Sequence, residues 1–234
     1  MAQTDCPQTT FEFQVLGSRK VQANFDGGHL SSDGGGALFL REVEALLIDE
    51  GVKAIPRKSK EIVIDFDATD DPLHGSQEGA YFNGYYRHYC YLPLYAFCGN
   101  VPLWSELRDC KRDGSLGTAE ALQKIVPRIR KRFGKNVRII VRGDGGVCRE
   151  SIMGWCDSQE KDYYCVGLST NQRLRRIIAP KLGKLQHDIA HENLELPVRR
   201  FTEFSYATLD SWSRKRRLSP NWKFSRRGKT PASS

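Results

Sequence analysis

Hydrophobic and polar positions divide the chain into short apolar runs separated by charged and glycine-rich stretches. The run Ile62-Val63-Ile64 is typical of a buried strand and leads directly into acidic residues. Within 118–133, apolar side chains recur at i, i+3, i+4 and i+7, which predicts an amphipathic helix that Thr118 would cap. The predicted buried stripe of this helix is Leu122, Ile125, Val126 and Ile129.

The same patterns predict a regular series of elements from Ile62 onward. Their order is strand, strand, strand, helix, strand, helix, strand. They occupy 62–64, the aromatic stretch 79–98, 103–108, 118–133, 137–142, about 150–159, and 163–168. This is the order of the ribonuclease H-like fold, an α/β fold with a mixed sheet in which the first and fourth strands are neighbours. A further strand is expected over 201–208.

The two ends of the chain have weaker patterns. Residues 14–25 alternate like a strand, and 37–47 form a run that predicts a helix. Residues 49–60 contain glycine, proline and several basic residues, which is typical of a linker. Residues 218–234 have no apolar period and no acidic residue, which predicts a disordered basic tail.

Composition limits the kinds of partner and compartment. The formal net charge of +8 favours a polyanionic partner. Seven cysteines without a C-x-x-C pair predict free thiols in a reducing cytoplasm rather than a disulfide framework or a zinc site. No apolar run approaches the roughly 18 residues of a membrane span, so no membrane partner is expected.

Two acidic positions are candidate metal ligands. A strand places Asp65 and Asp67 on one face, where a divalent cation such as Mg²⁺ would relieve their repulsion. Asp144 follows the strand at 137–142 and lies beside glycines that allow close approach. In the predicted fold these carboxylates meet at one sheet edge. The alternative is that the aspartates simply end a strand and begin a turn at Asp71-Pro72.

Aromatic and basic clusters have two interpretations each. The tyrosine-rich stretch at 79–98 can supply core strands, which we favour, or stack on nucleic-acid bases. The basic clusters can contact DNA phosphates or form a solvated surface. The candidate DNA-binding residues are Arg173, Arg175, Arg176, Arg199, Arg200, Arg214, Lys215, Arg216 and Arg217.

Three segments resemble the DDE transposases of the IS1380 family of bacterial insertion sequences. They are DFDATDDPLHGSQEGAYFNGYYRHYCYLPLYAFCGN, RGDGGVCRESIMGWC and FTEFSYATLDSWSRKRR, within about 62–217. The early SSDGGGALFLRE also resembles that family's opening segment. The resemblance implies a ribonuclease H-like core that cuts DNA at insertion-sequence ends and joins the free 3′-hydroxyl to target DNA.

The resemblance also implies specific ligands and partners. Asp67 would be the first catalytic and metal-binding carboxylate, with Asp65 as second choice, and Asp144 would be the second carboxylate. The cofactor would be Mg²⁺ or Mn²⁺, held in such sites as a pair of ions. The partners would be double-stranded DNA, namely terminal inverted repeats and target DNA, and other transposase chains in homo-oligomers or mixed oligomers. The location would be the bacterial cytoplasm at the nucleoid.

The chain departs from the family pattern in two ways. The long DNA-binding region that separates the family's opening segment from its acidic strand is missing, and nothing matches the late motif that carries the third acid. The nearest carboxylates, Glu192 and Glu195, lie in surroundings unlike that motif. We therefore expect the resemblance to the family to end near Arg217 and the core to be incomplete at the C-terminus. We also expect little or no transposition by this chain alone. A non-catalytic DNA-binding fragment and a decayed remnant are the alternatives.

These inferences divide the chain into three expected parts. They are an N-terminal segment and linker at 1–60, a partial ribonuclease H-like DDE core at 61–217, and a disordered basic tail at 218–234.

Overall fold

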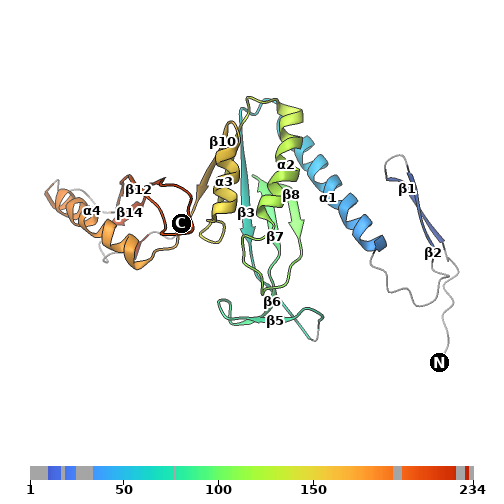
Figure 1. Ribbon diagram of the computed structural model, residues 1–234, viewed down its shortest axis with the longest axis horizontal. Helices are drawn as coiled ribbons and strands as arrows, with labels where there is room; N and C mark the ends of the chain where they lie inside the picture. The colour runs from blue at the N-terminus through green and yellow to red at the C-terminus, as the bar shows by residue number, and fades with distance from the viewer. Residues whose placement is uncertain are drawn as a thin grey trace.

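A five-stranded mixed sheet lies at the centre of the computed structural model, which describes residues 10–16, 19–24, 34–75, 77–191, 197–224 and 230–231 (Figure 1). Its strands are β3 (Glu61–Ala68), β7 (Leu94–Cys98), β8 (Val101–Glu106), β9 (Arg138–Gly143) and β10 (Asp162–Val166). The spatial order is β10-β9-β3-β7-β8. Strands β3, β9 and β10 are parallel, whereas β7 and β8 are added antiparallel, so β3 is the central strand.

Three helices pack on one face of this sheet. They are α1 (Gly34–Ala54), α2 (Thr118–Phe133) and α3 (Glu150–Ser158). Alternate residues of β3, namely Ile62, Ile64 and Phe66, are buried in one core cluster with all three helices. The intervening residues of β3 point to the opposite face, where Val63 and Asp65 are only half-buried. The sheet therefore has a covered face and an open face.

The start of α2 corrects one prediction. The expected apolar stripe of α2 is confirmed, because its four residues are all buried. However, Gly117 occupies the N-cap position with φ of 86°, and Thr118 is a buried first helical residue that makes no capping bond. A Cβ on Gly117 would lie 2.8 Å from Glu106 Oε2, so both conformation and space favour glycine at this position.

The segment expected to be a linker at 49–60 is partly helical. Helix α1 continues to Ala54; its side chains Ile48 and Val52 are buried, and so is Ile55 directly after it. The helix continues because Ile48 and Val52 are one turn apart and both face the core formed with β8 and α2. The packed core therefore begins before Glu61.

Close packing of α1 on β8 gives a test of this arrangement. A Cβ added to Gly51 would lie 2.4 Å from Pro102 O, so we expect Gly51→Ala to lower the free energy of unfolding by about 1–3 kcal/mol. The matched control is Gly183→Ala in α4 (Gln172–His191), where nothing lies within 4 Å and better helix propensity should stabilise by about 0.5–1 kcal/mol. Urea denaturation measures both changes. A neutral or stabilising Gly51→Ala would show that α1 does not pack against β8 in this way.

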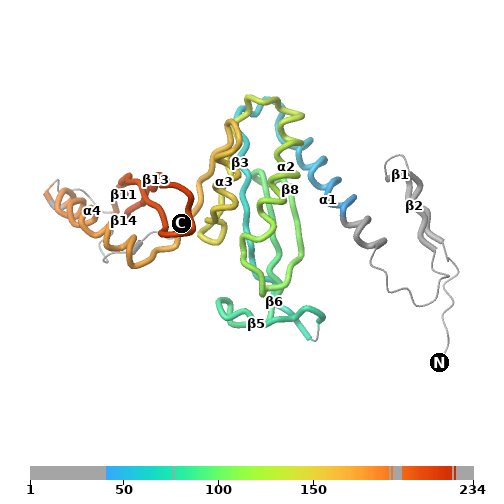
Figure 2. The backbone as a smooth tube through the Cα atoms, in the orientation of Figure 1, coloured from blue at the N-terminus to red at the C-terminus, as the bar shows by residue number. Residues whose placement is uncertain are grey.

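The tyrosine-rich stretch forms a second, smaller sheet instead of contributing only core strands. Strands β4 (Asp71–Pro72), β5 (Tyr81–Asn83) and β6 (His88–Tyr91) pair in the order β4-β6-β5. Figure 2 shows this sheet beyond the end of the main one, between β3 and β7 in the chain. Phe82, Tyr85 and Tyr89 are exposed, with Tyr85 86% accessible. The expectation that these aromatics belong to the core is wrong for them, because so small a sheet cannot cover both of its faces.

The remaining described residues form short paired strands around α4. They are β11 (Val198–Phe201), β12 (Phe204–Tyr206), β13 (Arg216–Leu218), β14 (Asn221–Phe224) and β15 (Thr230–Pro231). β14 pairs with β11, and β13 with β12. Leu218 and residues 221–224 therefore lie in strands, which differs from the disordered tail expected from residue 218. Backbone pairing does not need an apolar period.

At the other end of the chain, β1 (Thr10–Leu16) and β2 (Arg19–Asn24) form an antiparallel pair. No helix in the described part of the chain is both long and apolar enough to cross a bilayer.

Candidate metal centre and nucleic-acid interface

Asp65 lies on the open face of β3 and is engaged by Arg142 on β9. The two residues are register partners, and the guanidinium forms a two-point ion pair with the carboxylate, with Nη2 2.8 Å from Oδ2 and Nε bonded to Oδ1. Because this geometry uses both oxygens of Asp65, its charge is already balanced by the protein.

Asp67 and Asp144 lie at the same edge of the sheet. The last register pair of β3 and β9 is Phe66 with Gly143. Asp67 follows Phe66 within β3, where it pairs with Tyr95 of β7, and Asp144 follows Gly143 just past the end of β9. Both aspartates are exposed. Parallel strands end at a common edge, so this register brings together two carboxylates that are far apart in the sequence. No cation among the described residues forms an ion pair with either carboxylate.

The turn after β9 holds Asp144 in place. Its Oδ1 accepts a hydrogen bond from the Gly146 amide at 2.8 Å, and its carbonyl accepts one from Val147 at 3.2 Å. Gly143 is needed at this turn, because a Cβ there would lie 2.7 Å from Val147 Cγ2. The tight turn therefore projects the aspartate beyond the sheet edge.

Tyr86 has several acidic groups in its surroundings. Partial burial raises the pKa of its phenol, and the charges of Asp70, Tyr85, Asp67 and Asp144 raise it further. Its hydroxyl donates to the carbonyl of Ala68, the last residue of β3, at 3.5 Å. Asp70 is itself held by a histidine, with His88 Nε2 2.7 Å from its Oδ2.

A salt bridge joins two loops near this edge. Arg149 Nη2, just before α3, lies 2.7 Å from Asp113 Oδ2 in the loop before α2. Burial opposes ionisation of Asp113, but hydrogen bonds from Ser115 and Arg149 outweigh it and lower its pKa to about 2. Asp113 therefore stays ionised in this link at neutral pH.

Arg216 differs from the other basic candidates because it is buried. Its guanidinium bonds to both oxygens of Glu150 at 2.7 and 3.0 Å, to Asp157 at 2.9 Å, and to the phenol of Tyr164 at 2.8 Å. Burial opposes its charge, but these bonds outweigh that effect and raise its pKa. The expectation of a DNA contact at Arg216 is wrong, since no donor remains at the surface; the residue instead anchors β13 to α3.

Some of the other basic candidates already bind partners within the protein. Arg214 pairs with Asp157, Arg217 lies 3.4 Å from Glu203, and Arg173 donates to the Ala207 carbonyl. Arg200 is half-buried. The candidates with exposed side chains are Arg173, Arg175, Arg176, Arg199, Arg214, Lys215 and Arg217.

The donor set at the edge fits one hard cation. Mg²⁺ in proteins is commonly held by one or two carboxylates, with waters and substrate phosphate completing the shell, and Asp67 and Asp144 can supply two carboxylates. Among the described residues, no group of three or more His, Cys, Asp or Glu is placed to hold a metal. Glu192 and Glu195 lie outside the described residues.

The contacts of two residues in this region, Arg142 and Tyr86, do not follow from the sequence pattern. Arg142 was not considered as a partner of Asp65, although the alternation in 137–142 places Arg138 and Arg142 on one strand face. The position of Tyr86 had no usable signal, because it depends on the fold of the small sheet.

Comparison with known protein families agrees with this architecture. The model of the family described as transposase DDE domain, group 1, matches residues 39–230. The match continues past Arg217, where we expected likeness to end, and includes β14, which pairs with β11. No curated protein and no solved structure matches the chain. The mixed α/β architecture is consistent with the ribonuclease H-like fold of DDE transposases. The chain therefore belongs to the group 1 family of transposase DDE domains.

Proposed function

We propose that this chain acts in DNA transposition as an IS1380-type DDE domain at insertion-sequence ends, with Asp67 and Asp144 as its metal-binding and catalytic carboxylates. The observation that carries this proposal is the last register pair of β3 and β9, Phe66 with Gly143, which the two aspartates follow directly in the chain. Asp65 becomes the weaker candidate because Arg142 already neutralises it. The strand order of the main sheet, with the first and fourth strands adjacent, supports a ribonuclease H-like core.

The side chains at the edge have distinct roles in this proposal. Asp67 and Asp144 would hold Mg²⁺ or Mn²⁺, which when bound polarises a phosphate oxygen and lowers the pKa of attacking water. The Asp144 turn fixes one carboxylate through its backbone hydrogen bonds. The hydroxyl of Tyr86 donates to the Ala68 carbonyl at 3.5 Å, which ties the small sheet to the end of β3 next to Asp67.

Duplex DNA is the proposed partner, in the form of terminal inverted repeats and target DNA. Exposed aromatic residues on the small sheet lie next to the carboxylate edge, where base or sugar contact is physically favourable. Exposed arginines at the start of α4 and on β11 add positive charge for phosphate. Assembly with further transposase chains and action at the bacterial nucleoid belong to the same proposal.

We further propose that this chain alone cleaves DNA slowly or not at all. Two-metal phosphoryl transfer needs ligands that clamp both ions, about 3.5–4 Å apart. Asp67 and Asp144 suffice for one ion, and no stretch of the sequence resembles the family's late acidic motif. The chain would then act mainly as a DNA-binding partner, which is the alternative class that the basic surface favours.

The test uses a supercoiled plasmid that carries the gene with its flanking genomic DNA. We expect salt-sensitive binding to this DNA and, with Mg²⁺ or Mn²⁺, no nicking above the background of Asp144→Asn. Gel electrophoresis of the plasmid measures nicking, and a filter-binding assay measures affinity. Nicking that Asp144→Asn abolishes would overturn the inactivity proposal while supporting the site. Failure to bind DNA at low salt would contradict the proposed function altogether.

A further inference from the structure

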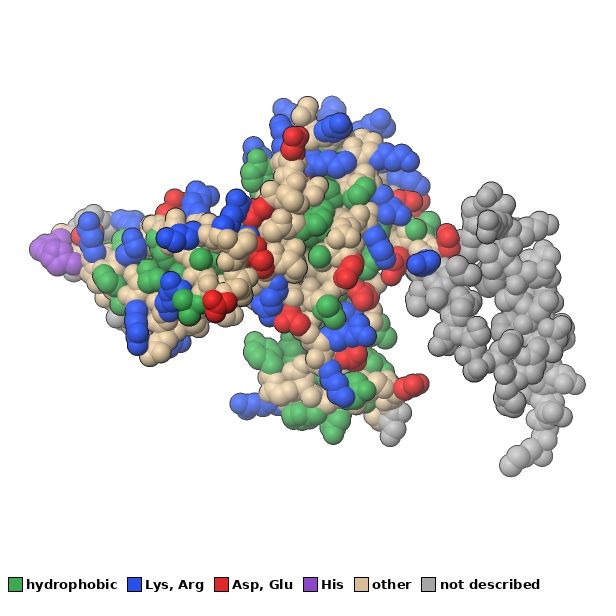
Figure 3. Space-filling model, viewed as in Figure 1, with side chains coloured by type: hydrophobic (Ala, Val, Ile, Leu, Met, Phe, Trp, Pro, Cys, Tyr) green, Lys and Arg blue, Asp and Glu red, His purple; other side chains and the backbone are tan. Residues whose placement is uncertain are grey.

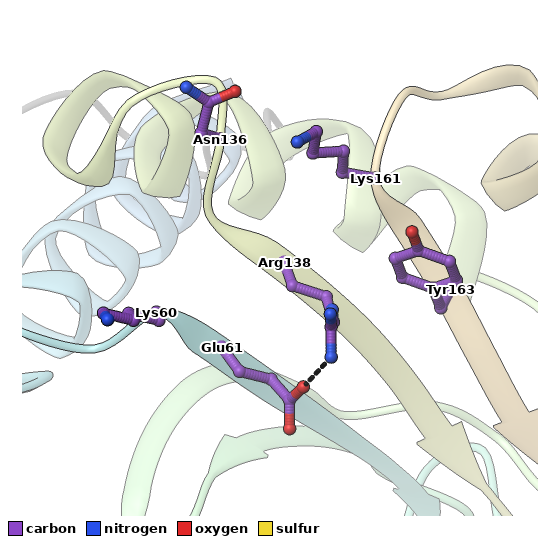
Figure 4. A pocket seen from close by; sticks show the side chains of 6 residues that line it. All are labelled: Lys60, Glu61, Asn136, Arg138, Lys161 and Tyr163. Atoms are coloured by element: carbon purple, nitrogen blue, oxygen red, sulfur yellow. Dashed lines mark hydrogen bonds and ion pairs between the residues drawn. The ribbon is translucent and has the colours of Figure 1, made fainter.

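A basic cavity lies at the end of the sheet opposite the carboxylates. It has a volume of about 440 Å³ and opens where β3, β9 and β10 begin (Figure 4). It is lined by Lys60, Glu61, Asn136, Arg138, Lys161 and Tyr163. Glu61 is balanced by Arg138, whose Nη1 lies 3.0 Å from its Oε2. In the described part of the chain, Lys60 and Lys161 have no carboxylate within ion-pair distance, so the cavity has a net positive charge.

Hydrogen bonds from one arginine hold the walls of this cavity in place. The guanidinium of Arg130, in α2, donates to the carbonyls of Lys135 and Glu160, both at 3.1 Å, and to that of Val137. It also pairs with Asp162, whose side chain is 1% exposed. One side chain thus joins the end of α2 to the segments that enter β9 and β10. Anion-binding groups on a fixed frame lose less conformational freedom on binding than those on mobile loops.

The backbones of the two lysines are also tied to β9. The Lys60 carbonyl accepts from the Arg138 amide at 3.0 Å, and the Lys161 carbonyl accepts from the Ile139 amide at 3.1 Å. Lys161 has φ of 62°, a left-handed conformation that glycine or asparagine adopts far more easily. Backbone strain of this kind concentrates at functional sites, which supports a use for the charge of Lys161.

The cavity and the carboxylates share the open face of the sheet. Glu61 and Asp67 lie on the same face of β3, six positions apart, which corresponds to about 20 Å of strand. Arg142 projects from that face between them. A duplex that lies along this face presents the backbones of its two strands alternately to the protein. One duplex can therefore contact both ends of the face, with one strand at the carboxylates and the other at the cavity.

We propose that the cavity of Lys60, Arg138 and Lys161 binds the sugar–phosphate backbone of duplex DNA, about 20 Å along the duplex from the phosphate at Asp67 and Asp144. This inference rests on the proposed function and adds a contact surface to it. Backbone phosphate is favoured over a small free anion because the surrounding surface is itself basic. Figure 3 shows Lys and Arg side chains gathered over this end of the molecule. Exposed cations near the cavity in the sequence are Arg57, Lys58, Lys131 and Lys135.

The test is the salt dependence of binding to a non-cognate duplex for Lys60→Gln/Lys161→Gln. Because this double variant can neutralise two fewer phosphates, we expect the log–log salt slope to shrink by about 1.8 and affinity to fall roughly tenfold at moderate salt. The control is Lys124→Gln/Arg128→Gln, which removes the same charge from the outer side of α2, where the partners are Glu44 and Asp49. Equal effects of the two double variants would contradict DNA binding by the cavity, because they would show only a general effect of net charge.

Two further measurements separate the cavity from folding and from DNA binding in general. Lys161→Gly removes both the charge and the left-handed strain, so we expect weaker DNA binding with an unchanged or higher melting temperature. Acetylation footprinting should show that DNA protects Lys60 and Lys161 but not Lys124. If DNA binds but leaves both cavity lysines unprotected, the cavity proposal is contradicted and the proposed function is not. If the wild type binds no DNA at all, both proposals are contradicted. Protection by inorganic pyrophosphate but not by DNA would assign the cavity to a small anion and also overturn the proposal.

Discussion

Arg216→Ala is expected to lower the free energy of unfolding by about 2–3 kcal/mol, because Glu150 loses its charged partner and Asp157 keeps only Arg214. The side chain of Arg216 is 4% exposed and bonds to Glu150 and Asp157 on α3 and to Tyr164 on β10. Its removal also detaches β13 from the central domain. Urea denaturation followed by circular dichroism measures the loss, and proteolysis should become faster between β10 and α4.

The adjacent arginine is a matched control for this prediction. Arg217 has the same chemistry, but its side chain is 77% exposed and its contact with Glu203 is 3.4 Å. We expect Arg217→Ala to change stability by less than about 1 kcal/mol. Similar losses from both variants would contradict the anchoring role of Arg216.

Asp67→Asn and Asp144→Asn are each expected to abolish the effect of divalent cation on DNA binding. An ion shared between these carboxylates and a DNA phosphate couples the two binding events, and such coupling is typically about tenfold. Wild-type affinity for duplex should therefore rise about tenfold from EDTA to Mg²⁺ or Mn²⁺, and either substitution should remove this gain. Both residues are exposed, so stability should change by less than about 0.5 kcal/mol. Fluorescence anisotropy with a labelled duplex measures the affinities.

Asp65→Asn is the control for this second prediction. It alters a carboxylate that Arg142 already occupies, so the cation-dependent gain should remain. If Asp65→Asn removes the gain and Asp67→Asn does not, the first ligand has been assigned to the wrong residue of β3.

Local patterns were sufficient to predict the elements that carry the candidate site. The stripe from Leu122 to Ile129 and the alternation of β3 follow from helix and strand periods, which depend only on nearby residues. Likewise, the apolar runs ending at Asp67 and Asp144 indicate strands whose carboxyl ends are acidic. The adjacency of those ends is a property of the sheet order, which the sequence pattern indicates only through the order of the elements.

Other features depend on partners that are distant in the sequence. Arg216 is one of four consecutive cationic residues, and the sequence does not separate it from its neighbours. Its contacts with Glu150 and Asp157 in the folded protein are what bury it. Glycine and proline at 51 and 56 suggested a linker, yet Gly51 is there because α1 approaches β8 closely. The exposed tyrosines were expected in the core because strand composition does not reveal which sheet a strand joins.

The central claim is that Asp67 and Asp144 lie together and hold one divalent cation, and iron-mediated backbone cleavage tests it most directly. Fe²⁺ replacing Mg²⁺ generates hydroxyl radicals in the presence of ascorbate and peroxide, and these cut the chain near the ligands. We expect two cuts, one next to Asp67 and one next to Asp144, that excess Mg²⁺ suppresses and that either Asp→Asn substitution removes together. Cleavage at only one of the two positions, or two cuts that respond independently to the substitutions, would contradict a shared site.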